Sequence, residues 1–76
     1  MQYRLKFIDS FEATVRALNI DAADDDSAIS YCCAQSIYFD MPIELWRADD
    51  LVLRTTPMTA RLYLPDLGEL HVRSTA

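Results

Sequence analysis

The sequence predicts a small α+β domain, in which a four-stranded antiparallel sheet (β-β-α-β-β) carries one helix on one face. The 76 residues leave room for a single core. Residues 3–8, 43–47 and 51–55 have the apolar patterning of strands. Residues 28–37 instead repeat apolar side chains at helical spacing. The element order follows from these two periods and from a second strand assigned between residues 13 and 21.

The first two strands are predicted at residues 3–8 and 13–21. The first alternates apolar and basic side chains, so Arg4 and Lys6 are expected on the face turned away from the core. In the second, the parity of the apolar positions changes along the strand. A bulge near residues 16–17 would restore one buried face, because one extra residue reverses the alternation.

An acidic run opens the helix. Asp24 is the expected N-cap, and Asp25 and Asp26 follow where the positive end of the helix dipole favours anions. Pro42 ends the helical region, because it disfavours helical geometry in the residue before it. The stripe that faces the sheet is expected to consist of Ala28, Ile29, Cys32, Cys33, Ser36 and Ile37.

The last two strands, residues 43–47 and 51–55, are joined by a predicted turn at residues 48–50. Strict alternation predicts that six side chains point at the helix: Leu5, Phe7, Ile43, Leu45, Leu51 and Leu53. It predicts the opposite direction for their neighbours Arg4, Lys6, Glu44, Trp46, Val52 and Arg54. The face turned away from the helix is therefore expected to combine an indole with cations.

Residues 1–57 are predicted to form this domain, and residues 58–76 a C-terminal extension. Within the extension, residues 61–64 and 69–73 are short and β-like, and the Pro, Asp and Gly between them favour a turn. The extension is expected to be a small hairpin, which would extend the sheet or cover its open face, or a tail.

Charge and cysteine usage indicate the compartment and the class of partner. The net charge is −5, and four acids lie between Asp21 and Asp26. This balance opposes direct binding to nucleic acid, which requires clustered Lys and Arg. It permits binding to basic proteins, or it simply promotes solubility. The sequence has no signal-peptide layout and no apolar run long enough to cross a membrane. Cys32 and Cys33 are adjacent, which does not suit a disulfide framework. We expect a soluble, cytoplasmic protein.

Few residues suit catalysis. The chain has one glycine, Gly68, so a glycine-rich phosphate loop is excluded, and one histidine, His71. Cys33 and His71 could form a thiol–imidazole pair, but Cys33 lies on the apolar stripe, where a free cysteine acts as a small hydrophobe. The consecutive acids of residues 24–26 diverge by about 100° per residue on a helix and do not converge on a metal ion. We therefore expect no catalytic site, no metal and no cofactor.

Three sequence motifs occur in order: Tyr3-Arg4-Leu5-x-Phe7, Ala23-Asp24-Asp25, and Ile43-Glu44-Leu45-Trp46 followed by an acidic turn. Over residues 3–55 this pattern resembles that of a group of short bacterial proteins. The resemblance implies a ββαββ domain and no activity, and the extension after Pro57 departs from the pattern. In size, charge and element order the chain is also similar, more loosely, to small phage-encoded inhibitors of CRISPR systems, which is an analogy of fold alone.

The leading hypothesis is a non-catalytic protein-interaction module that binds a protein partner or a second copy as a homodimer. Trp and Arg dominate binding energy at interfaces. The predicted contact residues are Arg4, Lys6, Trp46 and Arg54. The same face could instead be a solvated surface whose indole is covered by alkyl stems or by the extension.

Two other functions stay open. A phage-type inhibitor of a nucleic-acid-binding complex would present carboxylates in place of phosphates, using Asp24, Asp25, Asp26, Asp49 and Asp50. A small thiol-dependent enzyme would use Cys33 and His71.

Overall fold

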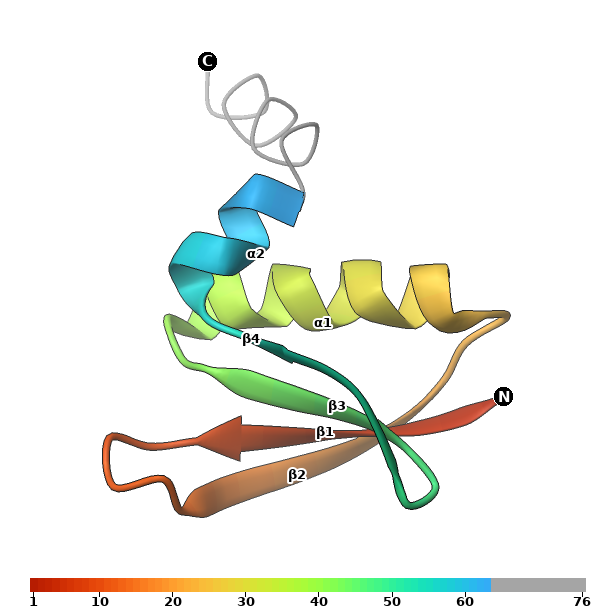
Figure 1. Cartoon of the computed structure of the whole chain (residues 1–76), viewed down its shortest axis with the longest axis horizontal. Helices are drawn as coiled ribbons and strands as arrows, with labels where there is room; N and C mark the ends of the chain where they lie inside the picture. The colour runs from red at the N-terminus through yellow and green to blue at the C-terminus, as the bar shows by residue number, and fades with distance from the viewer. Residues whose placement is uncertain (64–76) are drawn as a thin grey trace.

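A four-stranded antiparallel sheet with the strand order β2-β1-β3-β4 forms one layer, and helix α1 lies across one of its faces (Figure 1). The computed structural model describes residues 1–63. The elements are β1 (Gln2–Ile8), β2 (Thr14–Asp21), α1 (Asp25–Phe39), β3 (Ile43–Arg47), β4 (Asp50–Thr55) and α2 (Pro57–Tyr63). The predicted α+β architecture is confirmed, with α2 as a second helix that the sequence did not predict.

The core lies between α1 and the inner face of the sheet, the face turned toward the helix. Leu5 of β1 and Leu45 of β3 pair directly and are fully buried. Ala28 and Cys32 of α1 are buried against them, as the predicted stripe requires. The apolar stripe of α1 and the inner residues of the strands therefore form one contiguous core cluster. Burial of this cluster supplies most of the stability of a domain this small.

Side chains and backbone groups cap both ends of α1. The Asp24 carboxylate accepts a hydrogen bond from the Ser27 backbone N–H at 2.8 Å, so the predicted N-cap is confirmed. At the other end Asp40 adopts a left-handed conformation, with φ of 55°, and its N–H donates to the Ser36 carbonyl. The Ser36 hydroxyl donates in turn to the Met41 carbonyl at 2.6 Å, which directs the chain into β3.

A bulge in β2 explains why the parity of its apolar positions changes along the strand. Phe7 pairs with Arg16, but Ile8 pairs with Thr14, so Val15 is the extra residue. The bulge thus lies one residue before the predicted position. After it, the inner positions of β2 are Arg16, Leu18 and Ile20, opposite the buried inner residues of β1.

A second bulge, in β4, corrects two predicted directions. Leu45 pairs with Leu53, but Trp46 pairs with Leu51, which leaves Val52 as the extra residue. Leu51 therefore lies on the outer face opposite Trp46 and is 49% exposed, whereas Val52 packs against the core. Strict alternation predicted the reverse for both residues and was wrong, because one inserted residue reverses the parity on one side of it.

The start of the C-terminal extension is helical. The Thr56 hydroxyl accepts from the Thr59 backbone N–H at 3.2 Å, and Pro57 takes the first helical position. Ala60 is fully buried, and α2 packs on α1. The strand predicted at residues 61–64 is therefore wrong for residues 61–63. The predicted turn and the strand at residues 69–73 lie outside the described residues. Within residues 1–63, neither helix combines the length and apolarity that crossing a bilayer requires.

We expect Leu45→Ala and Leu51→Ala to differ sharply in their effect on stability. Leu45→Ala leaves a cavity in the core and should lower the free energy of unfolding by about 2–5 kcal/mol. Leu51→Ala, on the outer face, should lower it by less than about 1 kcal/mol. Urea titrations of both variants measure the difference. Equal losses would mean that Leu51 points into the core and that β4 has no bulge.

Candidate functional site

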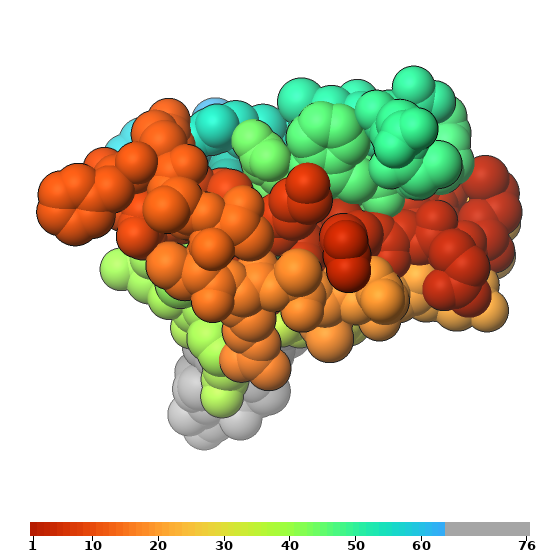
Figure 2. Space-filling view, turned by 90° about the horizontal axis from the view of Figure 1, so that it is seen from below, coloured from red at the N-terminus to blue at the C-terminus, as the bar shows by residue number. Residues whose placement is uncertain are grey.

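The candidate site is the outer face of the sheet, the face opposite α1. It is formed by Arg4, Lys6, Glu44, Trp46, Leu51 and Arg54, which come from β1, β3 and β4. The register places Arg4 beside Trp46, and Lys6 beside Glu44. Figure 2 views the sheet from this side, with β1 between β2 and the β3–β4 pair. Both described helices lie on the other side of the sheet (Figure 1).

The Trp46 indole is held in place on both its face and its edge. The Lys6 ammonium lies 4.7 Å from the centre of the ring, within cation–π range. The indole N–H donates to Glu44 Oε1 at 3.1 Å. Trp46 is half-buried although neither helix of residues 1–63 covers it. The Lys6 side chain over the ring agrees with the alternative in which neighbouring side chains cover the indole, and the contact face stays a prediction.

Glu44 is the centre of a polar network on the outer face. Its second carboxylate oxygen accepts from Arg54 Nη1 at 3.2 Å, and Arg54 also pairs with Glu12 of the β1–β2 loop. Arg4 donates instead to Asn19 of β2 at 3.2 Å. The structure thus gathers all four predicted contact residues on one face; Glu44 links Trp46 and Arg54, and Lys6 joins them through the indole ring. The predicted site omitted Glu44, although its place two residues before Trp46 on the same strand puts both on one face.

This geometry combines several features that protein contact surfaces use. The face offers an aromatic ring, aliphatic area and charges fixed by hydrogen bonds. No group of three or more His, Cys, Asp or Glu side chains within residues 1–63 is placed to hold a metal ion. Rigid aromatic and cationic side chains lose little entropy on binding.

Two of the five predicted acidic contact residues, Asp24 and Asp25, form hydrogen bonds with other residues of the chain. Asp24 caps α1, and the Ser27 N–H lowers the pKa of its carboxyl. Asp25 accepts from the Tyr3 hydroxyl at 2.5 Å and from Arg47 Nη1 at 2.6 Å. The hydrogen bond from Tyr3, followed by that from Arg47, lowers the pKa of Asp25. Asp25 therefore ties the start of α1 to β1 and β3.

The remaining acids lie at one end of the molecule, here called the acid end. Asp26, Asp49 and Asp50 are exposed and form no ion pair within residues 1–63. The start of α1 and the β3–β4 turn both lie at this end (Figure 1). A shallow hollow of about 400 Å³, lined by Met1, residues 24–26 and Arg47, opens there. The two acidic runs thus lie toward the same end of the molecule, one in the helix layer and one at the edge of the sheet, and three of their carboxylates form no ion pair within residues 1–63.

Both cysteines lie in the core. Cys32 and Cys33 are fully buried, and burial raises the pKa of Cys32 to about 12 and that of Cys33 above its ordinary value. A protonated, buried thiol is a poor nucleophile. His71, the other residue of the proposed thiol–imidazole pair, lies outside the described residues. The burial of the cysteines opposes the thiol-enzyme alternative.

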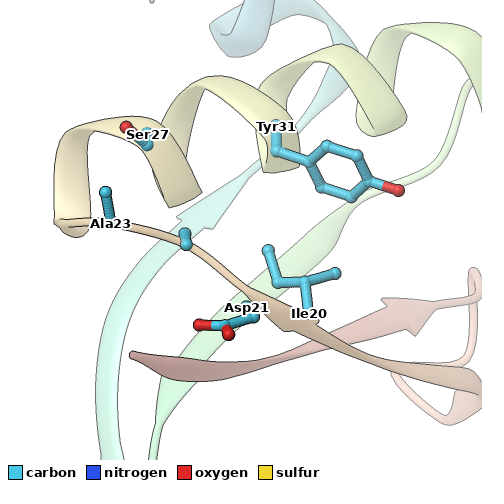
Figure 3. Close-up of a pocket in the computed structure, with 6 residues that line it drawn as sticks. Ile20, Asp21, Ala23, Ser27 and Tyr31 are labelled. Carbon is cyan, nitrogen blue, oxygen red and sulfur yellow. The ribbon is translucent and has the colours of Figure 1, made fainter.

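A groove between β2 and α1 had no signal in the sequence analysis. It has a volume of about 550 Å³ and is lined by Ile20, Asp21, Ala22, Ala23, Ser27 and Tyr31. Figure 3 shows Ile20 pointing up toward α1 and the Tyr31 ring extending from the helix above it. The residues come from a strand end, a loop and a helix, and only the chain fold brings them together.

No protein-family model matches the chain, and no curated protein or solved structure does. The resemblance of residues 3–55 to short bacterial proteins stays a prediction.

The Asp25 ion pair predicts a specific acid sensitivity. Because its native pKa lies below the ordinary value of 3.8, the Asp25 carboxylate stabilises the fold fully above that pH and progressively less as the pH falls through the native pKa. The stability difference between wild type and Asp25→Asn should therefore be largest near pH 7 and shrink below about pH 4. Urea titrations at a series of pH values measure it. For the control, Asp26→Asn, the difference should stay small throughout; an Asp25→Asn difference independent of pH would contradict the ion pair.

The cysteine environment predicts slow alkylation. A pKa of about 12 gives Cys32 a thiolate fraction at neutral pH about a thousandfold below that of an exposed cysteine. Iodoacetamide labelling, followed by mass spectrometry, should be slow in the native chain and fast in urea. A native rate equal to the unfolded rate would place the thiols at the surface and revive the thiol-dependent alternative.

Proposed function

We propose that this protein is a non-catalytic protein-interaction module that binds its partner through the outer face of the sheet. The proposal rests on one observation: Trp46 is fixed between Lys6 and Glu44 on a face that neither described helix covers. An aromatic ring held in one orientation before binding gives more of its contact energy to affinity.

The charges on this face indicate the class of partner. Arg4, Lys6 and Arg54 gather here in a chain whose net charge is −5, and Glu44 and Glu12 neutralise only part of their charge. A protein surface with apolar area at its centre and carboxylates at its rim would complement the outer face. Nucleic acid fits less well, since the overall charge repels phosphates.

A second candidate function uses the acid end. The clustering of Asp26, Asp49 and Asp50 favours an acidic, phage-type inhibitor that occupies the nucleic-acid groove of its target. Because Asp24 and Asp25 are engaged within the fold, the mimic would depend on the three free carboxylates. It would lose affinity steeply with salt, whereas a partner bound around Trp46 would lose less.

The two functions are separated by matched variants in one binding assay. Cell extract is passed over the immobilised chain, the retained proteins are identified by mass spectrometry, and the purified partner is titrated by calorimetry. Trp46→Ala should weaken binding at least about tenfold, because a central indole is a typical hot spot. Trp46→Phe should recover part of the loss, and Tyr38→Ala, which removes an aromatic side chain 80% exposed on α1, should have no effect.

A variant with a neutralised acid end tests the second candidate function in the same assay. The triple variant Asp26→Asn, Asp49→Asn, Asp50→Asn should keep the partner if the outer face is the contact surface. Loss of the partner in this variant, with full binding by Trp46→Ala, would reject the outer face and favour the acidic inhibitor. Circular dichroism of each variant confirms that the fold is intact.

A further inference from the structure

The longest regular open edge of the sheet belongs to β2. The sheet order leaves β2 and β4 at the two edges. In β4 a bulge at Val52 interrupts a strand of only 6 residues, and bulged edges resist further pairing. In β2 the bulge lies at Val15, near one end, so Arg16–Asp21 remains regular. This run contains no proline, glycine or lysine to protect it.

Beside this edge, the groove leaves apolar surface without a cover. Helix α1 packs mainly on β3 and β4 and reaches β1 through the Asp25–Tyr3 hydrogen bond and the Phe39–Phe7 ring contact. Leu18 and Ile20 are therefore only half-buried, and Tyr31 above them is 41% exposed. The groove of about 550 Å³ opens between them (Figure 3).

At the other end of β2, the β1–β2 loop presents an aromatic side chain on a fixed backbone. The Asp9 carboxylate accepts from the backbone N–H groups of Phe11 and Ala13, both at 2.9 Å. The Glu12 N–H donates to the Asp9 carbonyl, which closes the turn. Phe11 is nevertheless 87% exposed. The loop protrudes at one end of the molecule in both views (Figures 1 and 2). Nothing within the described chain covers this ring.

We propose that β2 pairs antiparallel with β2 of a second copy, and that Phe11 of each copy fills the groove between β2 and α1 of the other. The open backbone groups of the two edges would hydrogen-bond with each other. The open edge, the groove and the protruding ring are each used twice, as a twofold interface requires.

Symmetry restricts the register of this pairing. Antiparallel strands related by a twofold axis keep both helices on the same side of the joined sheet, so inner residues must face inner residues. With Leu18 at the axis, Leu18 packs on its own copy and Arg16 lies opposite Ile20. Ala13 of one copy then lies opposite Ala23 of the other, which brings the loop carrying Phe11 to the groove.

The charges agree with this arrangement. The Arg16 guanidinium lies 6.0 Å from the centre of the Phe7 ring and 5.9 Å from that of Phe39, and it forms no ion pair within residues 1–63. In the proposed dimer it lies beside the end of β2 that leads to Asp21 and residues 24–26 of the other copy. A free cation thus meets the acidic side of its neighbour, and no charge of β2 faces itself.

Sedimentation equilibrium of the full chain tests the proposal. We expect a dimer at micromolar to submillimolar concentration. Phe11→Ala should raise the dissociation constant at least about tenfold, and Arg16→Glu should raise it as well. Tyr38→Ala, an exposed aromatic on α1, is the matched control and should leave it unchanged. Trp46→Ala should not change the dissociation constant either. The dimer proposal is therefore tested separately from the proposal that the outer face binds a partner.

A cross-link tests the register. Leu18→Cys places two cysteines at the axis, within the distance that a disulfide spans, and mild oxidation should give a covalent dimer. Val15→Cys, opposite Asp21 in this register, should not cross-link. The native cysteines are buried and do not interfere. A single-chain mass at every concentration would overturn the proposal, as would a dimer that neither Phe11→Ala weakens nor Leu18→Cys traps. In that case the edge would be left for a strand of a different protein.

Discussion

The alternation of side chains in β1 is the constraint on which the structure depends. This strand pairs on both sides, and Leu5 lies between Leu18 of β2 and Leu45 of β3. A shift of one residue would turn Arg4 and Lys6 into the core. The cost of burying two unpaired cations exceeds what any other contact could restore. The other strands therefore adapt to this frame: β2 has its bulge opposite β1, and β4 has its bulge opposite β3, the second neighbour of β1.

In residues 1–63 the sheet forms one layer and the helices form a second layer on one of its faces. The surfaces discussed above are the parts of the sheet that this helical layer does not cover. With α1 placed mainly over β3 and β4, neither helix of residues 1–63 covers the inner side of β2 or the outer face. The protein treats these surfaces differently. On the outer face Trp46 is enclosed by Lys6 and Glu44, which lowers its exposure. Beside β2, apolar side chains share the lining of an open groove with Asp21 and Ser27.

Much of the fold could be predicted because its signals are local. The period of two in β1, the Asp24 cap and the stripe of α1 each involve neighbours in the chain. The β4 register could not be predicted, since Leu51-Val52-Leu53 is apolar at every position and has no parity. Nor could α2, because its position depends on Ala60 packing against α1. In the site, the four outer contacts followed from alternation. The Asp25–Arg47 pair joins residues that are 22 positions apart, so no local sequence pattern predicts it.

The proposed partner would meet charges of both signs, because the acid end borders the outer face. In the register of β3 and β4, Asp50 lies opposite Arg47 and precedes Leu51, which lies opposite Trp46, so this carboxylate belongs to the strand region beside the indole. Charges in physiological salt are screened only over about 8 Å, so charges that are close neighbours on one sheet act on the same ligand. The cations of the outer face would attract carboxylates of a partner above Trp46, whereas Asp49 and Asp50 would repel them at one edge of that face. Arg47 does not cancel this repulsion, because within residues 1–63 it forms an ion pair with Asp25 alone. The ion pair that fastens α1 to the sheet therefore leaves this edge of the outer face acidic, and a partner with a cation at that edge would fit best.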